Sequence, residues 1–139
     1  MNYKIITKYI KNSTFEIPDS KIYFNLANDI NNYRINIDIK SEQLKDKLIL
    51  VNTTLSLIPK VNLEKKIKSE VCFSSLVELD GDLTDKSGLE EIILIKVPEN
   101  IYPELRKIFI YFFEKSGFTG IKIDESVDFK KLNSLRKNF

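Results

Sequence analysis

A run of six apolar residues, Ile108 to Phe113, places the strongest constraint on how this chain can fold. The run lies between Pro103, which suits the first turn of a helix, and Gly117, which suits the position just past a helix end. The predicted helix is therefore apolar on every side in its second half, whereas a helix on the surface of a small domain needs only one apolar stripe. A sheet can cover one side. Because the other side also needs a cover, we expect it to contact a second subunit through Ile108, Phe109 and Phe112.

The first half of the chain shows the two-residue alternation that is typical of half-buried strands. The clearest example is Tyr33 to Lys40, in which the odd positions are apolar and the even positions are polar. Leu48 to Ile58 and Lys65 to Asp80 predict two further long strands, and Tyr3 to Ile10 predicts another near the N-terminus. Ser41 to Lys47 is polar and predicts a turn. Because the connections are short, the strands are expected to pair antiparallel.

The second half of the chain is predicted to be helical, with one segment left open. Leu89 to Val97 is compatible with a strand, a short helix or a buried irregular segment. Ser126 is expected to cap a final helix that runs towards Asn138, with Phe129, Leu132 and Leu135 as its apolar stripe. Strands followed by helices, with no linker and no repeat, predict a single α+β domain over residues 1–139.

The composition argues against an enzyme, a metal centre and a nucleic-acid site. The chain has no histidine and one cysteine, so the common zinc sites and histidine-dependent triads are excluded. Cys72 is interpreted as a small buried hydrophobe, and the lack of a disulfide partner fits the reducing cytoplasm. The carboxylates between Glu78 and Asp85 lack the spacing of a calcium loop and are interpreted as a solvated turn. No cofactor is expected.

Charge and hydropathy exclude two further classes. The formal net charge of +2 is spread along the chain, whereas a nucleic-acid-binding face would be dominated by basic residues. The longest apolar run has the six residues described above, far fewer than a membrane span needs. The strand-like N-terminus also lacks the apolar core of a signal peptide. We therefore expect neither nucleic-acid binding nor membrane insertion.

Three stretches carry a resemblance to a known family. Tyr9 to Pro18 is similar to its first-strand signature, Tyr-x-Lys-Asp-x-Ser-Phe-Glu-x-Pro, and Val97 to Arg106 is similar to Cys-Pro-x-x-Leu-Phe-Pro-Tyr-Ala-Arg at the head of its long helix. Ser116 to Phe118, followed by Val127 to Phe129 and Leu132, is similar to its ending, Gly-Phe…Pro-Val-Asn-Phe-x-x-Leu. The order and spacing agree over about residues 3 to 135. On these residues the chain resembles the SecB protein-export chaperones.

The resemblance implies a four-stranded antiparallel sheet backed by a long helix, with a short C-terminal helix, assembled as a dimer of dimers. It also implies that unfolded preproteins bind in an apolar groove and pass to the motor SecA without any cofactor. By alignment, the residues that would line the groove are Tyr33, Ile35, Ile37, Leu132 and Leu135. The same pattern is equally typical of an ordinary core, and that alternative stays open.

One departure from the family concerns the acidic surface on which SecA docks. Glu16 and Glu70 are retained, but Asn12 and Lys68 replace an aspartate and a leucine of the family pattern. The loss of one negative charge and the gain of one positive charge weaken attraction to a basic partner. Two alternatives follow: a SecB-like chaperone dedicated to one client, such as a toxin–antitoxin partner, or a non-chaperone adaptor subunit on the same fold.

Overall fold

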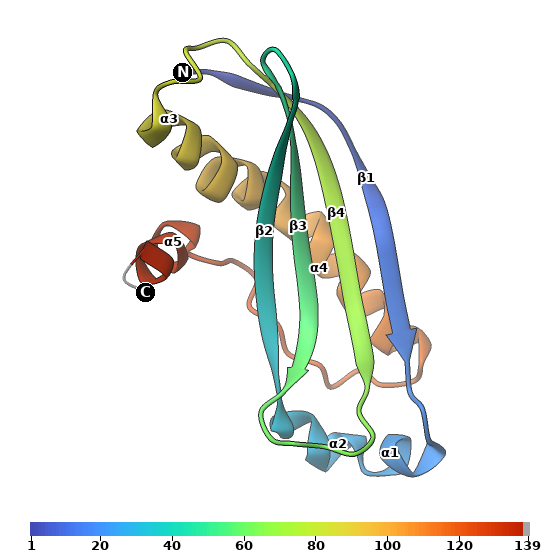
Figure 1. Cartoon of the computed structure of the whole chain (residues 1–139). Helices are drawn as coiled ribbons and strands as arrows, with labels where there is room; N and C mark the ends of the chain where they lie inside the picture. The colour runs from blue at the N-terminus through green and yellow to red at the C-terminus, as the bar shows by residue number, and fades with distance from the viewer. Residues whose placement is uncertain (138–139) are drawn as a thin grey trace.

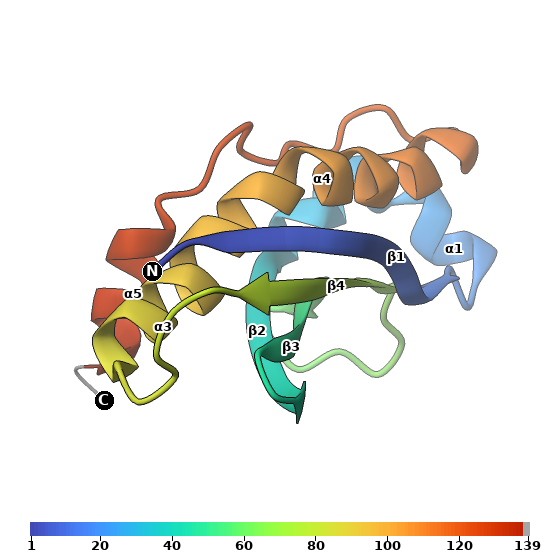
Figure 2. The same cartoon turned by 90° about the horizontal axis from the view of Figure 1, so that it is seen from above.

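The protein has two layers, a four-stranded sheet and a helical layer that crosses one of its faces (Figure 1). A computed structural model describes residues 1–137, with side chains described as far as residue 135. Seen from above, the long helix lies across one face of the sheet, and the opposite face carries no helix (Figure 2). The two faces of the sheet therefore have different roles, and each is considered separately below.

The sheet is antiparallel throughout, and its strand order is β1-β4-β3-β2. Its strands are β1 (Tyr3–Glu16), β2 (Tyr33–Lys45), β3 (Leu48–Pro59) and β4 (Lys68–Leu79). The predicted alternation is confirmed, because the odd-numbered residues of β3 from Ile49 to Leu57 are all buried. The order leaves β1 and β2 as the two edge strands.

Two strand ends differ from the prediction. β1 continues six residues beyond Ile10, through irregularities at Ile5/Thr7 and Ile10/Asn12 that resemble β-bulges. β2 continues to Lys45, so the predicted turn over residues 41–47 is wrong except for its last two residues. There Asp46 adopts a φ of 45°, a left-handed conformation that aspartate tolerates better than most residues, and a tight hairpin closes.

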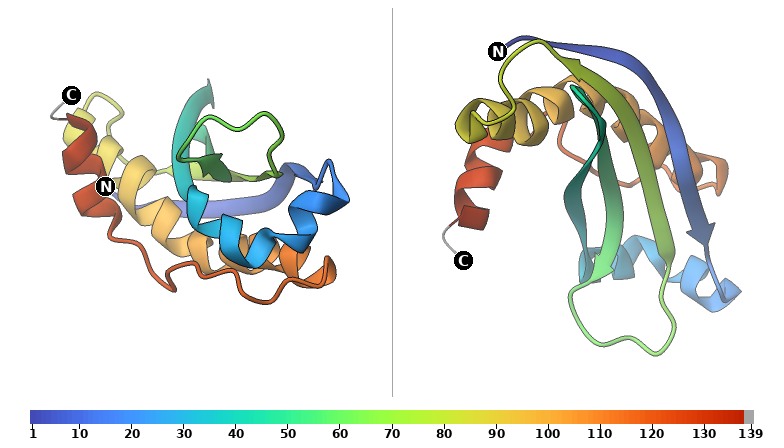
Figure 3. Two further views of the ribbon diagram at one scale, coloured as in Figure 1. Left: turned by 90° about the horizontal axis from the view of Figure 1, so that it is seen from below. Right: turned by 45° about the horizontal axis from the view of Figure 1, so that its top comes forward.

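The helical layer is one continuous run from Lys86 to Lys115, which resolves the open segment around residues 89–97. It consists of α3 (Lys86–Glu91), the π-helical turn η2 (Ile92–Lys96) and α4 (Val97–Lys115), and it bends along its length (Figure 3). The predicted start at Pro103 is wrong, because Pro103 lies inside α4. The missing N–H leaves the carbonyl of Glu99 without its usual partner, and both residues are exposed, so water can take that place.

A single stripe of α4 forms the centre of the core. Val97, Ile101, Leu105, Phe109 and Phe113 recur every four residues and are all 0% exposed. The last four pack with helix-facing side chains that include Leu55, Val71 and Phe73, and Val97 packs in a second cluster with Ile49, Val51 and Val77. The expected all-round burial therefore does not occur within one chain: Ile108 and Phe112 remain partly buried, and Tyr111 is exposed.

Short helices that the sequence did not predict connect β1 to β2. They are α1 (Ser20–Phe24), α2 (Leu26–Asp29) and the 3-10 turn η1 (Ile30–Asn32). Asp19 caps α1 by accepting the N–H of Lys21 at 2.9 Å, and it also pairs with Lys65 Nζ at 3.1 Å. These partners hold the pKa of Asp19 below its usual value. The contact joins the α1 segment to the loop between β3 and β4.

The end of α4 and the last helix complete the fold. Gly117 has a φ of +81°, as expected of the residue just past a helix end, and an added Cβ there would lie 2.6 Å from the hydroxyl of Tyr23. The final helix is α5 (Phe129–Lys137). The predicted cap at Ser126 is wrong, since Asp128 accepts the N–H of Lys131 at 3.0 Å. The predicted end at Asn138 lies outside the described residues.

Candidate functional site

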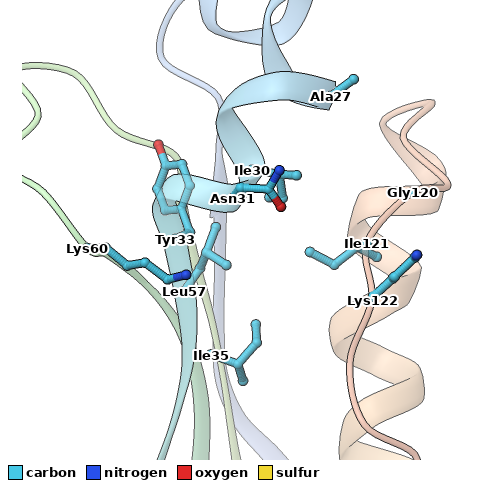
Figure 4. Close-up of a pocket in the computed structure, with 10 residues that line it drawn as sticks. All are labelled: Ala27, Ile30, Asn31, Tyr33, Ile35, Leu57, Lys60, Gly120, Ile121 and Lys122. Carbon is cyan, nitrogen blue, oxygen red and sulfur yellow. The ribbon is translucent and has the colours of Figure 1, made fainter.

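A groove of about 360 Å³ opens beside the edge strand β2, at the lower end of the sheet in Figure 1. One wall comes from α2, η1, β2 and the end of β3, and the other comes from the loop after α4 (Figure 4). We call this feature the β2 groove. Its first wall consists of Ala27, Ile30, Asn31, Tyr33, Ile35, Leu57 and Lys60. Its second wall consists of Gly120, Ile121 and Lys122.

Tyr33 holds the first wall in place. Its ring is buried, and its hydroxyl oxygen accepts the backbone N–H of Ile67 at 3.1 Å. Ile67 directly precedes β4, so this bond ties the start of β2 to the end of the β3–β4 loop. The backbone N–H of Lys60 also donates to the carbonyl of Asn32 at 2.6 Å. The groove wall is therefore held by buried and backbone hydrogen bonds, which favours a preformed site.

Two side chains of α4 hold the second wall. The hydroxyl of Tyr102 donates to the carbonyl of Asp124 at 2.6 Å. Arg106 donates to the carbonyl of Ile123 through Nε at 3.1 Å and Nη2 at 3.0 Å. Burial raises the pKa of Tyr102, with Arg106 opposing the effect, so the phenol stays a neutral donor. These bonds hold the loop at residues 123 and 124, and Ile121, two residues earlier, is directed towards the strand wall (Figure 4).

The lining of the groove combines aliphatic side chains with an amide and two lysines. Ile30, Ile35, Leu57 and Ile121 offer aliphatic surface, and Asn31 adds an amide. None of the lining residues is an aspartate, a glutamate or a cysteine, so the lining offers no carboxylate and no thiol nucleophile. No cluster of three metal-ligating side chains occurs in the part of the chain that the structure describes. Such a site can bind apolar side chains.

The structure brings together two of the five predicted groove residues, Tyr33 and Ile35. Ile37 is on the same face of β2, half-buried against the core beyond the groove. Leu132 is also half-buried against the core, and Leu135 is 51% exposed on α5, so neither lines the groove. Sequence reasoning missed Ile30 and Ile121, because neither belongs to a long periodic segment.

The predicted docking residues lie along the other face of the sheet. Glu16 is directly opposite Lys68 in the β1–β4 ladder, and Asn12 is opposite Cys72. Glu70, Asn12 and Cys72 contribute to a polar hollow of about 340 Å³ on this face. Cys72 is buried there, which confirms the prediction that it is a buried residue. The replacements at positions 12 and 68 therefore change the charge of one continuous surface.

The predicted interface residues of α4 divide into two kinds. Phe109 is 0% exposed within the single chain, so its side chain offers no open surface to a second subunit. Ile108 and Phe112 keep part of their side chains exposed. Phe112 also stacks on Phe15 of β1, with 5.8 Å between the ring centroids.

Among the helices of residues 1–137, none combines the length and the apolar character that a membrane span requires.

Arg106→Ala is expected to release the second wall of the groove. The substitution removes both hydrogen bonds to the Ile123 carbonyl, and bonds of this charged kind contribute about 1.5–3 kcal/mol. Backbone NMR order parameters of residues 119–125 should fall from the rigid range of about 0.85 towards 0.6 or lower. Lys107→Ala, at the exposed neighbouring position, is the control and should leave them unchanged. Unchanged order parameters in Arg106→Ala would show that the loop is held by something else.

The comparisons with known proteins agree with one another. The family model of the preprotein translocase subunit SecB matches residues 1–138. A SecB protein-export protein of Pelagibacter ubique is 39% identical over 137 residues, which cover 99% of this chain and 98% of the relative. The protein-export protein SecB of Ehrlichia ruminantium is 24% identical over 154 residues, covering 95% of this chain and 88% of that one.

One solved structure supports the same fold. It is the Mycobacterium tuberculosis SecB-like chaperone Rv1957 in complex with a ChAD peptide from the antitoxin HigA1. The two structures superpose with a TM-score of 0.61 at 11% sequence identity, covering 88% of this chain and 89% of that chain. The predicted sheet, long helix and short C-terminal helix are thereby confirmed. By its sequence over almost its whole length, this chain belongs to the SecB family of protein-export chaperones.

Proposed function

We propose that the chain holds unfolded polypeptides, preproteins among them, by binding their apolar side chains in the β2 groove. The observation that carries this proposal is the groove itself, whose aliphatic side chains on two anchored walls face one another across an open space. The SecB-like structural relative was solved with a peptide bound, which is consistent with peptide binding in this fold. No nucleotide and no covalent step are required for holding.

The edge position of β2 supports binding of an extended client. β2 has no partner strand on its outer side, so the backbone groups there are not used in the sheet. An extended segment beside this edge can place alternate side chains in the groove while its backbone remains hydrogen-bonded. Each apolar side chain that becomes buried contributes about 1.5–3 kcal/mol before ordering costs are subtracted. A few such contacts give reversible holding with little sequence specificity.

We also propose that α5 forms an outer boundary of the client path. Leu132 and Leu135 lie on one side of this helix, and Leu135 is 51% exposed. Ile37 extends the apolar face of β2 beyond the groove. These three residues would add contact area for a client longer than the groove.

Assembly into a tetramer, a dimer of dimers, would multiply the holding sites. The partly exposed Ile108 and Phe112, together with the exposed ring of Tyr111, form an apolar surface on α4 that a second subunit can cover. Several weak sites on one assembly bind one long client more tightly than any single site, because the local concentration of the remaining segments is high.

Transfer to SecA is proposed to be weaker than the family pattern implies. Glu16 and Glu70 keep two carboxylates on the helix-free face of the sheet, but Lys68 lies directly opposite Glu16 and Asn12 carries no charge. A basic docking segment would meet a surface of mixed sign. The holding function therefore has more support from the residues than the delivery step.

Ile35→Asp is expected to abolish suppression of aggregation when a denatured model substrate is diluted into buffer, because it places a charge in the apolar groove. Asn36→Asp is the matched control, since it makes the same charge change one residue away on the opposite face and should retain suppression. Leu135→Asp should reduce suppression in part. The proposed groove is contradicted if Ile35→Asp, folded and assembled like the wild type, still suppresses aggregation as measured by light scattering.

Phe112→Asp is expected to dissociate the assembly while leaving the subunit folded, because the side chain is only partly buried in one chain. Phe109→Asp should unfold the subunit, since it buries an unpaired carboxylate in the core. Light scattering coupled to size-exclusion chromatography gives the mass, and circular dichroism gives the fold. A Phe112→Asp protein of wild-type mass, or a monomeric wild type, would rule out the α4 interface.

A further inference from the structure

The charged residues of the β2 groove all have one sign. Among its ten lining residues, the charged ones are Lys60 on the strand wall and Lys122 on the loop wall, and no aspartate or glutamate is present. The two lysines come from opposite sides of the opening (Figure 4). Both residues are exposed, so their ammonium groups remain in contact with water and with anything that enters the groove.

The single sign is a local property of the groove. The whole chain is nearly balanced, with 22 lysines and arginines against 20 aspartates and glutamates. Two lysines elsewhere form ion pairs, Lys65 with Asp19 at 3.1 Å and Lys8 with Glu104 at 3.0 Å. The hollow on the other face of the sheet contains both signs, with lysines and carboxylates among its lining.

The acids nearest in sequence do not cancel the groove lysines. Glu64 follows Lys60 by four positions, and Asp124 follows Lys122 by two, but neither carboxylate lines the groove. No ion pair between either groove lysine and a carboxylate is found within the residues that the structure describes. An incoming segment would therefore meet the ammonium group of Lys60 beside Leu57, and Lys122 at the opposite rim, where its side chain extends away from the strand wall (Figure 4).

We propose that the β2 groove selects, among unfolded segments, those whose apolar side chains are flanked by aspartate or glutamate, and that Lys60 and Lys122 determine this preference. The inference rests on the proposed holding function and names the class of client that the groove prefers. Apolar burial provides the binding, and the lysines discriminate between flanking charges by attraction and repulsion.

The reach of the lysines is compatible with this geometry. An extended client advances by about 3.3 Å per residue, so carboxylates one to three positions from an apolar anchor lie near the groove rim. A lysine side chain can keep its stem on apolar surface while its ammonium group follows a charge in solvent. Because both ammonium groups are exposed, each ion pair is worth little by itself and is screened by salt. The preference is therefore expected to be moderate and salt-dependent.

The test uses three peptides that share one apolar core and differ only in flanking residues, which are glutamate, serine or lysine. Fluorescence anisotropy with the full-length protein at low salt should give the order glutamate, serine, lysine. From the usual size of exposed ion pairs, the first and last should differ about threefold to thirtyfold in Kd. The difference should shrink when the salt concentration is raised.

Variants assign the effect to the groove. Lys60→Glu with Lys122→Glu should invert the order of the three peptides, and Lys60→Arg with Lys122→Arg should preserve it. Lys47→Glu with Lys107→Glu makes the same change in net charge at exposed positions outside the groove and should leave the order as in the wild type. These three pairs separate a local preference from the effect of overall charge.

Two results would overturn the inference: equal or tighter binding of the lysine-flanked peptide by the wild type, or an order that the Lys60→Glu and Lys122→Glu pair does not change. Binding of all three peptides with equal Kd would leave the holding function standing and remove only the charge preference. If the serine-flanked peptide is not bound at any salt concentration, the holding function itself fails.

Discussion

The packing of one stripe of α4 on the sheet is the interaction on which the rest of the structure depends. Val97, Ile101, Leu105, Phe109 and Phe113 lie at four-residue intervals and are fully buried, so the helix has a fixed rotation about its axis. That rotation directs Tyr102 and Arg106, at the side of the stripe, towards the loop that follows the helix. The same rotation leaves Tyr111 exposed on the side away from the sheet.

The β2 groove is a consequence of this arrangement. One wall belongs to the sheet and its short helices, and the other is a loop without regular structure that is held by hydrogen bonds from α4. A loop fixed in this way costs less ordering free energy when a client binds than a free loop would. The core that stabilises the fold therefore also prepares the groove, and the opposite face of the sheet carries no helix (Figure 2).

Local periodicity accounts for the parts of the fold that the sequence predicted. The alternation from Tyr33 to Lys40 and the buried positions of β3 follow from the two-residue repeat of a strand, which neighbouring residues alone reveal. The helix start was predicted wrongly at Pro103. A proline inside a helix is tolerated where the carbonyl that loses its partner, here that of Glu99, can bind water, and this depends on the tertiary structure. α1 and α2 are too short to show a helical period, and the uniformly apolar residues 92–95 fit several structures equally well.

Local periodicity also explains why only part of the groove was predicted from the sequence. Tyr33 and Ile35 belong to a periodic strand, so a sequence pattern finds them. Ile121 lies on a loop that Tyr102 and Arg106 hold through the carbonyl groups of Asp124 and Ile123, and no side-chain pattern encodes such bonds. Leu135 belongs to the apolar stripe predicted for the last helix, but in the structure it does not line the groove. Lys60 and Lys122 look like ordinary surface lysines until the fold places them on facing walls.

The central claim is that unfolded clients bind in the β2 groove, and methyl NMR of the isoleucines tests it most directly. Ile30, Ile35 and Ile121 line the groove, whereas Ile58 points to the opposite face of the sheet. On addition of an unfolded, aggregation-prone client, we expect the methyl signals of the three groove isoleucines to shift or broaden while that of Ile58 does not. Changes at Ile58 without changes in the groove would place the client on the other face of the sheet and contradict the account.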